Sequence, residues 1–386
     1  MTGPSDKLGG IPRRPAVATA VRTPSRLHIL HVVEALGSGI ATALEQYVRS
    51  TPNHRHTVLG YRRASAQTGD ELERLGVRVL PLPEGRLAQI RTVRHWVRTL
   101  QPDLVHAHST YAGVYVRLFA RPPMASMVYT PHAYPFERRD VPAVLRGGFW
   151  LVEAALSLGG GCVAAVGARE AELAAHLPGR QAVVHLPNVV RDLRPRPSGP
   201  AGPDAASRGE LRLAMLGRIS PQKGPDFFAR AARLSQAWDL PLRWVWIGGG
   251  SPEEEQALRE AGAQVTGWLP RQEALDQLAS ADVYVHTAAW EGFPVSVLEA
   301  AALDVPVVAR RIPALRALGG AALCDTPEEM TALARSLLDP MAREALRRRS
   351  RVLMEHHRPD VQREALQRAY AIASGGRRRT PVTARP

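Results

Sequence analysis

Short apolar runs alternate with amphipathic stretches along most of the chain. In the first half, runs rich in leucine and β-branched residues predict strands at residues 27–33, 56–59, 77–80, 104–107, 125–130, 162–166 and 182–186. Between them, a helical period predicts helices at 41–49, 86–100, 111–120, 143–156 and 168–176. Strands and helices that alternate at this spacing predict a parallel sheet with helices on both faces.

A proline- and glycine-rich stretch interrupts this pattern. Residues 191–210 contain four prolines and three glycines without an apolar period, which predicts a linker. The alternation then resumes, with strands expected at 211–216, 243–247, 265–269, 283–286 and 305–309, and helices at 226–237 and from 252 onward. The predicted fold class is therefore α/β, with doubly wound domains at 26–190 and 211–358. Ligands of such sheets bind beyond the carboxyl ends of the strands, so the cleft between the domains is the expected site.

Composition narrows the class of protein. Hydrophobic residues make up 45% and charged residues 22% of the 386 positions, as in chains that fold around apolar cores. Cys162 and Cys324 are the only cysteines, which excludes a disulfide framework, argues against a structural zinc site and fits a cytoplasmic location. No segment has the pattern of a signal peptide or a membrane span, and we expect disordered tails at 1–25 and 374–386.

Positive charge is concentrated in the first half of the chain. Residues 1–200 carry 25 basic and 14 acidic side chains, and the whole chain has a formal net charge of +14. Such a surface suits nucleic acid, an anionic lipid surface or a phosphorylated substrate. Only two of the 50 basic residues are lysines, Lys7 and Lys223. A lysine is a compact point charge that suits a phosphate in a tight loop, which makes Lys223 a candidate phosphate-binding residue.

Two loops of the second domain carry candidate chemistry. The loop 217–224 places Arg218 and Lys223 beside a helix N-terminus, which favours an anion. The second loop contains Glu291 and leads into a helix whose free first amides suit a diphosphate. Glu299, inside that helix, suits the vicinal hydroxyls of a ribose, and Glu291 suits the group beyond the phosphates. Taken singly, Arg218 and Lys223 could equally be solvated loop cations. The pattern of the two carboxylates alone favours an ion-pair residue at Glu299 and a surface loop acid at Glu291.

Taken together, these motifs resemble the retaining glycosyltransferases of family 4, which have the GT-B architecture of two Rossmann-like domains. The matching elements are Gly37 and Gly39 after the first strand, Thr130-Pro131-His132, Gly217-Arg218-(x)4-Lys223-Gly224, Gly248-Gly249-Gly250, Gly267-Trp268-Leu269-Pro270 and Glu291-(x)7-Glu299. The resemblance covers about residues 27–355. The chain departs from many members in the first loop, where it reads Gly37-Ser38-Gly39-Ile40-Ala41.

The resemblance implies a role for each matching residue. His132, Glu291, Arg218 and Lys223 would form the catalytic set, with His132 on the acceptor side and the two cations on the donor diphosphate. The residues that would bind the donor are Gly37, Gly39, Arg218, Lys223, Gly267, Trp268, Glu291, Gly292, Phe293, Val295, Ser296, Val297 and Glu299. The implied donor is a nucleotide sugar, with uridine diphosphate as the usual carrier, and neither a metal nor another cofactor is expected. A helix at 359–373 would cross back to the first domain.

The implied activity is transfer of a sugar, with retention of configuration, to a glycan or lipid-linked acceptor, as in cell-envelope or exopolysaccharide synthesis. The basic first domain would bind the acceptor, at the inner face of the membrane if the acceptor is a lipid. A nucleotide-sugar epimerase of the same architecture is an alternative. A dinucleotide-dependent dehydrogenase would need a third glycine at Thr42. A nucleic-acid-binding protein would suit the charge, but the sequence shows no known binding module, so nucleic acid is not an expected partner.

Overall fold

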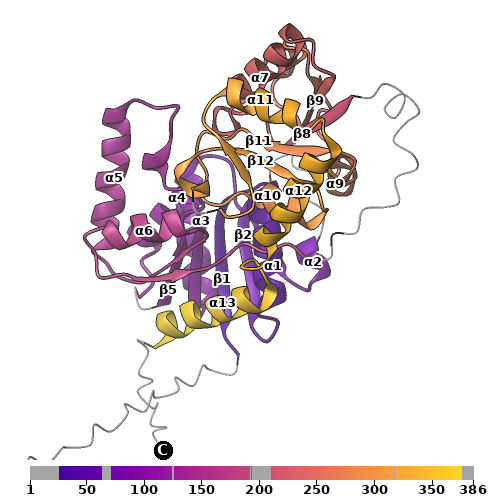
Figure 1. Ribbon diagram of the computed structural model, residues 1–386. Helices are drawn as coiled ribbons and strands as arrows, with labels where there is room; N and C mark the ends of the chain where they lie inside the picture. The colour runs from indigo at the N-terminus through magenta and orange to yellow at the C-terminus, as the bar shows by residue number, and fades with distance from the viewer. Residues whose placement is uncertain are drawn as a thin grey trace, which may run out of the picture.

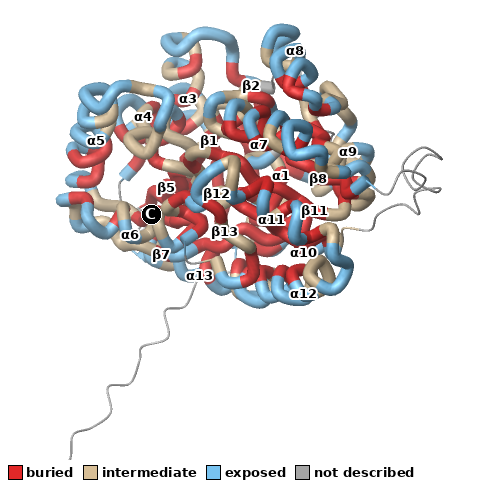
Figure 2. The backbone as a smooth tube through the Cα atoms, turned by 45° about the horizontal axis from the view of Figure 1, so that its top comes forward, coloured by how far each residue is buried: buried red, intermediate tan, exposed pale blue. Residues whose placement is uncertain are grey.

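Two α/β domains, each built on one parallel sheet, make up the protein (Figure 1). The computed structural model describes residues 26–62, 71–123, 126–191, 193, 210–316 and 318–375. The expected N-terminal tail, nearly all of the expected linker and most of the expected C-terminal tail lie outside these residues. The fold class predicted from the sequence is confirmed. Figure 2 shows the strands of both sheets buried beneath helices with exposed outer faces.

The first domain contains a seven-stranded parallel sheet in the order β3-β2-β1-β4-β5-β6-β7. Its strands are β1 His28–Leu36, β2 Arg55–Arg62, β3 Arg78–Pro81, β4 Leu104–His108, β5 Met127–Thr130, β6 Cys162–Ala165 and β7 Ala182–His185. Its helices are α1 Ser38–Ser50, α2 Glu71–Arg74, α3 Arg86–Leu100, α4 Thr110–Val114, α5 Ala143–Ser157 and α6 Ala168–His176, with a π-helix η1 Tyr115–Ala120 and a 3₁₀ turn η3 Pro135–Glu137. Strands buried on both faces are continuous apolar runs, which explains why the sequence located them.

The second domain repeats this plan with six parallel strands in the order β10-β9-β8-β11-β12-β13. The strands are β8 Leu211–Leu216, β9 Leu242–Ile247, β10 Gln264–Val265, β11 Val283–His286, β12 Val307–Arg310 and β13 Ala322–Cys324. The helices are α7 Pro225–Ala237, α8 Pro252–Glu260, α9 Arg271–Ala279, α10 Val295–Ala302, α11 Pro327–Ser336 and α12 Pro340–Ser350, with 3₁₀ turns η4 Pro221–Lys223, η5 Pro313–Leu315 and η6 Arg351–Met354. In the core, Phe228 of α7 packs edge-to-face on Trp244 and Trp246 of β9.

The C-terminal helix α13, Pro359–Ser374, packs on the first domain after the chain has left the second (Figure 1). Its buried residues Leu366, Ala369 and Tyr370 belong to the core that α1 and the first sheet form. The Ser50 hydroxyl of α1 donates a hydrogen bond to Gln362 at 2.8 Å. The two domains are therefore tied by this helix as well as by the segment that follows β7.

The structure adds elements that the sequence analysis did not predict, among them α2 and β13, and it alters several of the predicted ones. The strand expected at 265–269 ends at Val265, because Gly267 has a φ of +69° and forms only an isolated bridge with Gly248. The helix expected at 111–120 is divided into α4 and the π-helix η1. Helix α1 begins at Ser38, so Gly39 lies in its first turn and not in a loop. Among the described residues, no helix is long and apolar enough to cross a bilayer.

Candidate active site

The carboxyl ends of both sheets open onto one crevice. In each sheet the first strand of the domain lies centrally, with β1 between β2 and β4, and β8 between β9 and β11. The direction of strand progression reverses at these points, so the loops on either side diverge and leave room for a ligand. The crevice has a volume of about 480 Å³ and is lined by loops of both domains.

Most residues that the sequence analysis singled out line this crevice. They are Gly37, Gly39, His132, Arg218, Lys223, Trp268, Glu291, Gly292, Phe293, Val295, Ser296 and Glu299. Gly267 and Val297 are not among the lining residues. Val297 is fully buried, and its amide donates to the carbonyl of Pro294 with an N–O distance of 3.2 Å. Its amide is therefore already used inside the protein, unlike the role expected for it.

The loop after β8 holds Lys223 in place. The 3₁₀ turn η4 is followed by Gly224, which has a left-handed φ of +67°. A side chain at this position would collide with the carbonyl of Thr287, so both the backbone angle and the available space require glycine. The Thr287 hydroxyl donates to the Lys223 carbonyl at 2.8 Å, which ties this loop to the loop after β11.

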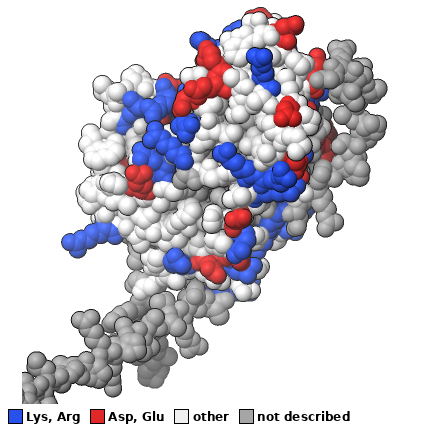
Figure 3. All heavy atoms as spheres, in the orientation of Figure 1, with Lys and Arg blue, Asp and Glu red and all other residues white. Residues whose placement is uncertain are grey.

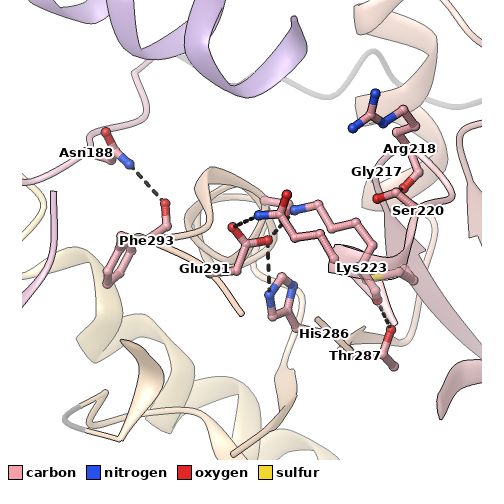
Figure 4. A network of polar contacts seen from close by, with 12 residues as sticks. Asn188, Gly217, Arg218, Ser220, Lys223, His286, Thr287, Glu291 and Phe293 are labelled. Carbon is pink, nitrogen blue, oxygen red and sulfur yellow. Dashed lines mark hydrogen bonds and ion pairs between the residues drawn. The ribbon is translucent and has the colours of Figure 1, made fainter. Parts of the chain in front are cut away.

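Lys223 and Glu291 form an ion pair in the crevice (Figure 4). Lys223 Nζ lies 2.5 Å from Glu291 Oε1, and the Gln222 amide donates to Oε2 at 3.2 Å. His286 Nε2 lies 3.9 Å from Glu291 Oε1, and burial together with the charge of Lys223 holds the pKa of His286 well below its ordinary value. The exposed Arg218 guanidinium stands apart from this group in Figure 4. The two cations expected from the sequence therefore occupy different parts of the crevice.

Helix α10 begins at the crevice, as the sequence analysis expected. Val295 and Ser296 form its first turn, where an α-helix leaves its amides without intrahelical acceptors and where the helix dipole is positive. The Ser296 hydroxyl accepts a hydrogen bond from Tyr284 at 2.7 Å, and the Tyr284 hydroxyl lies 3.0 Å from His286 Nδ1. This network fixes the helix start relative to β11. The helix start and Lys223 together give the crevice the character of an anion site.

Glu299 is held by Arg271, a residue that the sequence analysis did not identify. Arg271 Nη2 donates to Glu299 Oε1 at 2.6 Å, and the Glu299 side chain is only 4% exposed. The charge of Glu299 raises the pKa of Arg271, so the guanidinium stays protonated. The ion pair considered as the alternative role for Glu299 thus exists, while the same residue also lines the crevice.

His132 lies on a strained turn of the first domain. His132 and Ala133 have positive φ angles of 52° and 92°, conformations that cost about 1–3 kcal/mol each for such residues. The buried carboxylate of Glu170 supports the turn, because its Oε2 accepts a hydrogen bond from the Ala133 amide at 3.0 Å. Burial raises the pKa of Glu170 to about 7. Backbone strain held by a buried carboxylate is typical of a functional position.

Gly292 is a point of close contact between the two domains. A Cβ atom on Gly292 would lie 2.7 Å from the Ala133 nitrogen, 2.8 Å from Glu170 Oε2 and 2.9 Å from the His132 carbonyl carbon. Because two of these three atoms belong to the backbone, no side chain can rotate to make room. The contact therefore accommodates glycine without displacement of either loop, and it sets Glu291 next to the His132 turn.

Asn188 and His357 attach Phe293 to the first domain. The Asn188 amide donates to the Phe293 carbonyl at 3.0 Å (Figure 4), and the His357 ring donates through Nδ1 to the Asn188 carbonyl at 2.7 Å. The His357 and Phe293 ring centroids are 4.4 Å apart. Neither Asn188 nor His357 was identified from the sequence, since single polar residues in connecting segments produce no periodic signal.

Two parallel-sheet domains that face each other across a crevice define a protein of the GT-B architecture. The structure is similar to that of Anabaena HepE in complex with UDP-glucose, with a TM-score of 0.71, 17% identity and coverage of 89% of this chain and 98% of that one. It is also similar to WaaG, a glycosyltransferase involved in lipopolysaccharide biosynthesis, with a TM-score of 0.65, 14% identity and coverage of 90% and 100%. At these identities the likeness establishes the fold.

Sequence comparison establishes the family. Residues 38–189 match the glycosyl transferase 4-like domain, and residues 210–341 match glycosyl transferases group 1. The chain belongs to this family of glycosyltransferases. It is 28% identical over 254 residues to a Bacillus subtilis protein named as a teichuronic acid biosynthesis glycosyltransferase, TuaC, and the match covers 62% of this chain and 60% of that protein.

A second relative, from Escherichia coli, is named UDP-Gal:alpha-D-GlcNAc-diphosphoundecaprenol alpha-1,3-galactosyltransferase. It is 25% identical over 248 residues, which is 54% of this chain and 58% of that protein. The match thus spans about three fifths of the length of each of these two relatives.

Proposed function

We propose that this protein is a retaining glycosyltransferase that moves a sugar from a nucleotide-diphosphate donor to a glycan or lipid-linked acceptor. The observation that carries the proposal is the crevice, where Lys223, Arg218 and the first turn of α10 supply positive charge between Glu291 and Glu299. The UDP-glucose bound to HepE and the UDP-galactose named for the Escherichia coli relative support a UDP-sugar as the donor.

Cleavage of the donor requires the positive charge that the crevice provides. As the sugar–phosphate bond breaks, the sugar approaches an oxocarbenium ion and negative charge builds on the departing diphosphate. The crevice stabilises this charge through Lys223, Arg218 and the α10 amides. Because this stabilisation is stronger in the transition state than in the ground state, it accelerates the reaction. When a diphosphate binds the ammonium group of Lys223, Glu291 loses its ion-pair partner and can bind a hydroxyl of the transferred sugar. Since the protein supplies this charge, we expect activity to persist in a metal chelator.

Other residues of the crevice suit the nucleoside. Trp268 is 43% exposed and lines the crevice, so its indole is available to the base. Glu299 also lines the crevice, with one carboxylate oxygen fixed by Arg271, and can accept hydrogen bonds from the two ribose hydroxyls. A carboxylate held in advance loses little conformational entropy when the ribose binds.

The first domain provides the acceptor side, where His132 is placed. Burial lowers the pKa of His132 to about 4, so the imidazole is neutral at physiological pH. A neutral imidazole of low pKa is a weak base and acts best as a hydrogen-bonding group for a substrate hydroxyl.

An apolar helix face on the first domain indicates how a lipid-linked acceptor would reach the crevice. Helix α5 has only two charged residues, Arg146 and Glu153, and its side chains toward the protein include the fully buried Glu153. Its exposed face is apolar, with Val144 86%, Leu145 53%, Leu151 64%, Val152 46% and, directly after the helix, Leu158 68% exposed. A surface helix normally shows the reverse pattern, so this face needs an apolar partner.

We infer that the partner is an anionic membrane surface. Figure 3 shows Lys and Arg side chains gathered beside α5. The segment that precedes α5 contains Arg138, which pairs with Asp140, and the exposed Arg139. An apolar helix face flanked by arginines is suited to the boundary between lipid headgroups and acyl chains. The proposed enzyme would then work at the inner face of the membrane on a lipid-linked acceptor.

Product analysis tests the proposed reaction. The protein is incubated with UDP-sugars and with lipid-diphosphate sugars as acceptors, in the presence of a chelator, and products are examined by mass spectrometry and by NMR of the anomeric proton. We expect UDP and an α-linked product from an α-configured donor, and Lys223→Met should lower turnover about 100- to 1000-fold. Epimerised sugar and UDP formed without any acceptor would instead establish the epimerase alternative.

Vesicle sedimentation tests the membrane surface independently of turnover. We expect binding to phosphatidylglycerol vesicles at low salt, little binding to phosphatidylcholine vesicles, and loss of binding in Leu151→Glu. The matched control is Leu87→Glu, which changes a leucine that is 73% exposed on α3 instead of α5. Equal loss in both variants, or no binding by the parent protein, would contradict the assignment of α5.

A further inference from the structure

A row of histidines runs from the crevice into the interior of the first domain. His132 follows β5, His108 ends β4, His31 lies in β1 and His56 lies in β2, so the row crosses neighbouring strands of the sheet. His31 and His108 are fully buried and His56 is 6% exposed, whereas His132 is half-buried where it lines the crevice. The three imidazoles buried in the core need hydrogen-bond partners.

The histidines satisfy this need by bonding to one another in sequence. His132 Nε2 lies 3.3 Å from His108 Nδ1, and His108 Nε2 lies 3.0 Å from His31 Nδ1. His31 Nε2 lies 3.0 Å from His56 Nδ1. The last nitrogen of the chain, His56 Nε2, lies 3.0 Å from the carbonyl oxygen of Thr51.

The carbonyl at the end of this chain fixes its direction. A carbonyl only accepts, so His56 Nε2 carries the proton and donates it to Thr51. A neutral imidazole has one donor and one acceptor, so His56 Nδ1 must accept from His31 Nε2. Repeating the argument at His31 and at His108 places a proton on Nε2 of every member, including His132. Burial lowers the pKa of His56 and His132 to about 4 and those of His31 and His108 well below the ordinary value, which keeps all four neutral.

The hydroxyl of Thr51 cannot reverse the direction of the hydrogen bonds in the chain. It lies 3.3 Å from His56 Nε2, but its own proton is donated to the Tyr47 carbonyl at 2.7 Å. It can therefore only accept from His56. Both groups of Thr51 within reach of the last histidine impose the same polarity on the chain.

A metal ion is the competing explanation for clustered histidines. Nitrogens of His31, His106 and His108 lie within 4.8 Å of one another. However, both nitrogens of His106 are within hydrogen-bond distance of hydroxyls, Thr130 at 2.8 Å and Tyr370 at 3.3 Å, and both nitrogens of His31 and of His108 are used in the chain. An ion could bind only if several of these hydrogen bonds broke, so the observed contacts favour the chain.

We propose that the chain from Thr51 through His56, His31 and His108 fixes His132 as the tautomer with its proton on Nε2 and its lone pair on Nδ1. His108, His31 and His56 are then positioning residues. Within the described part of the chain, Nδ1 of His132 makes no hydrogen bond. On the proposed function, it would accept a hydrogen bond from a substrate hydroxyl in the crevice, while donation to that hydroxyl is excluded.

Nitrogen NMR of the full-length protein labelled with ¹⁵N-histidine tests the tautomer without any substrate. The His132 signals are assigned by their loss in His132→Gln. In the parent protein we expect one set of His132 signals, with the ¹⁵N chemical shift of Nε2 in the range of a protonated nitrogen and that of Nδ1 in the range of an unprotonated one. A His132 proton on Nδ1, or shifts of the His31 and His108 signals on addition of zinc at the protein concentration, would overturn the proposal.

A variant at the far end of the chain tests whether direction is transmitted. His56→Phe removes the nitrogen that accepts the hydrogen bond of His31 Nε2. Although His132 lies three hydrogen bonds away from this change, we expect a second set of His132 signals with the proton on Nδ1. The control is His106→Phe, which removes an equally buried imidazole of β4 but no link of the chain, and should leave one set. A single unchanged set in His56→Phe, or two sets in both variants, would refute transmission through the hydrogen bonds.

Turnover provides a second readout. If half of the His132 population adopts the other tautomer, kcat/KM in His56→Phe for the substrate whose hydroxyl binds His132 Nδ1 falls about twofold. An unchanged kcat/KM for both donor and acceptor in a variant with mixed tautomers would refute the role in the reaction. If the parent transfers no sugar at all, the proposed function fails, but the NMR result still decides whether the chain sets the tautomer.

Discussion

Substituting Gly292 by alanine places one methyl group at the contact between the domains. The added Cβ would lie 2.7–2.9 Å from the Ala133 nitrogen, from Glu170 Oε2 and from the His132 carbonyl carbon, whereas ordinary contacts begin at 3.4 Å. The two loops must therefore separate by roughly 0.5–0.7 Å. Overpacking of this kind costs about 1–3 kcal/mol. Because Glu291 precedes Gly292 directly, the same displacement moves the sugar-binding carboxylate away from His132.

The expected result is a loss of activity much larger than the loss of stability. A misplacement of about 1 Å can cost about 100-fold in rate, so we expect Gly292→Ala to lower transferase turnover roughly 10- to 100-fold. Urea denaturation should show a decrease of no more than about 3 kcal/mol in the free energy of unfolding. The control is Gly319→Ala, where no atom lies within 4 Å of the added Cβ. Parent-like turnover and stability in Gly292→Ala would refute the interpretation of this contact.

Three further predictions concern groups that support the crevice. Arg271→Met should lower the free energy of unfolding by about 3 kcal/mol in urea denaturation, because it leaves the buried Glu299 without its partner. Adding Glu299→Gln should restore this stability, whereas calorimetry should show that the affinity for the nucleotide is not restored. His56 and His132 have pKa values lowered to about 4, so their contribution to stability is complete above pH 6.5 and is lost as the pH falls. Each should cost about 1 kcal/mol of the unfolding free energy between pH 7 and 5.5. An unfolding free energy that stays constant over that range would contradict this prediction. The pKa of Glu170, raised to about 7, has the opposite sign: its contribution is complete below pH 4.5 and lost as the pH rises through 7, so Glu170→Gln should lose less stability than the parent between pH 5 and 8.

The sequence predicted the fold well because both sheets are buried on their two faces. Such strands are short continuous apolar runs, and β8 and β11 were located to the residue. The prediction failed for β10, which forms only two residues at the edge of its sheet, since Gly267 turns the chain away with a positive φ. A glycine in an apolar run does not reveal its φ in advance.

The candidate site was predictable where motif and backbone coincide. Lys223, Glu291 and the start of α10 depend on local loop geometry, and all of them line the crevice. Arg271 was not foreseen, because its ion pair with Glu299 joins residues 28 positions apart on two helices. The histidine chain was not foreseen either. His31, His56 and His108 sit in apolar strands, and only the parallel register of the sheet brings their rings together.

Calorimetric titration with uridine diphosphate tests the central claim most directly, namely that the crevice binds a nucleoside diphosphate through Lys223. The parent protein should bind with one site per chain, and Lys223→Met should weaken binding at least 10-fold. Arg230→Met, which removes an exposed arginine paired with Glu328 on the outer surface, should bind as the parent does. No heat of binding in the parent, or equal affinity in the parent and in Lys223→Met, would contradict the account.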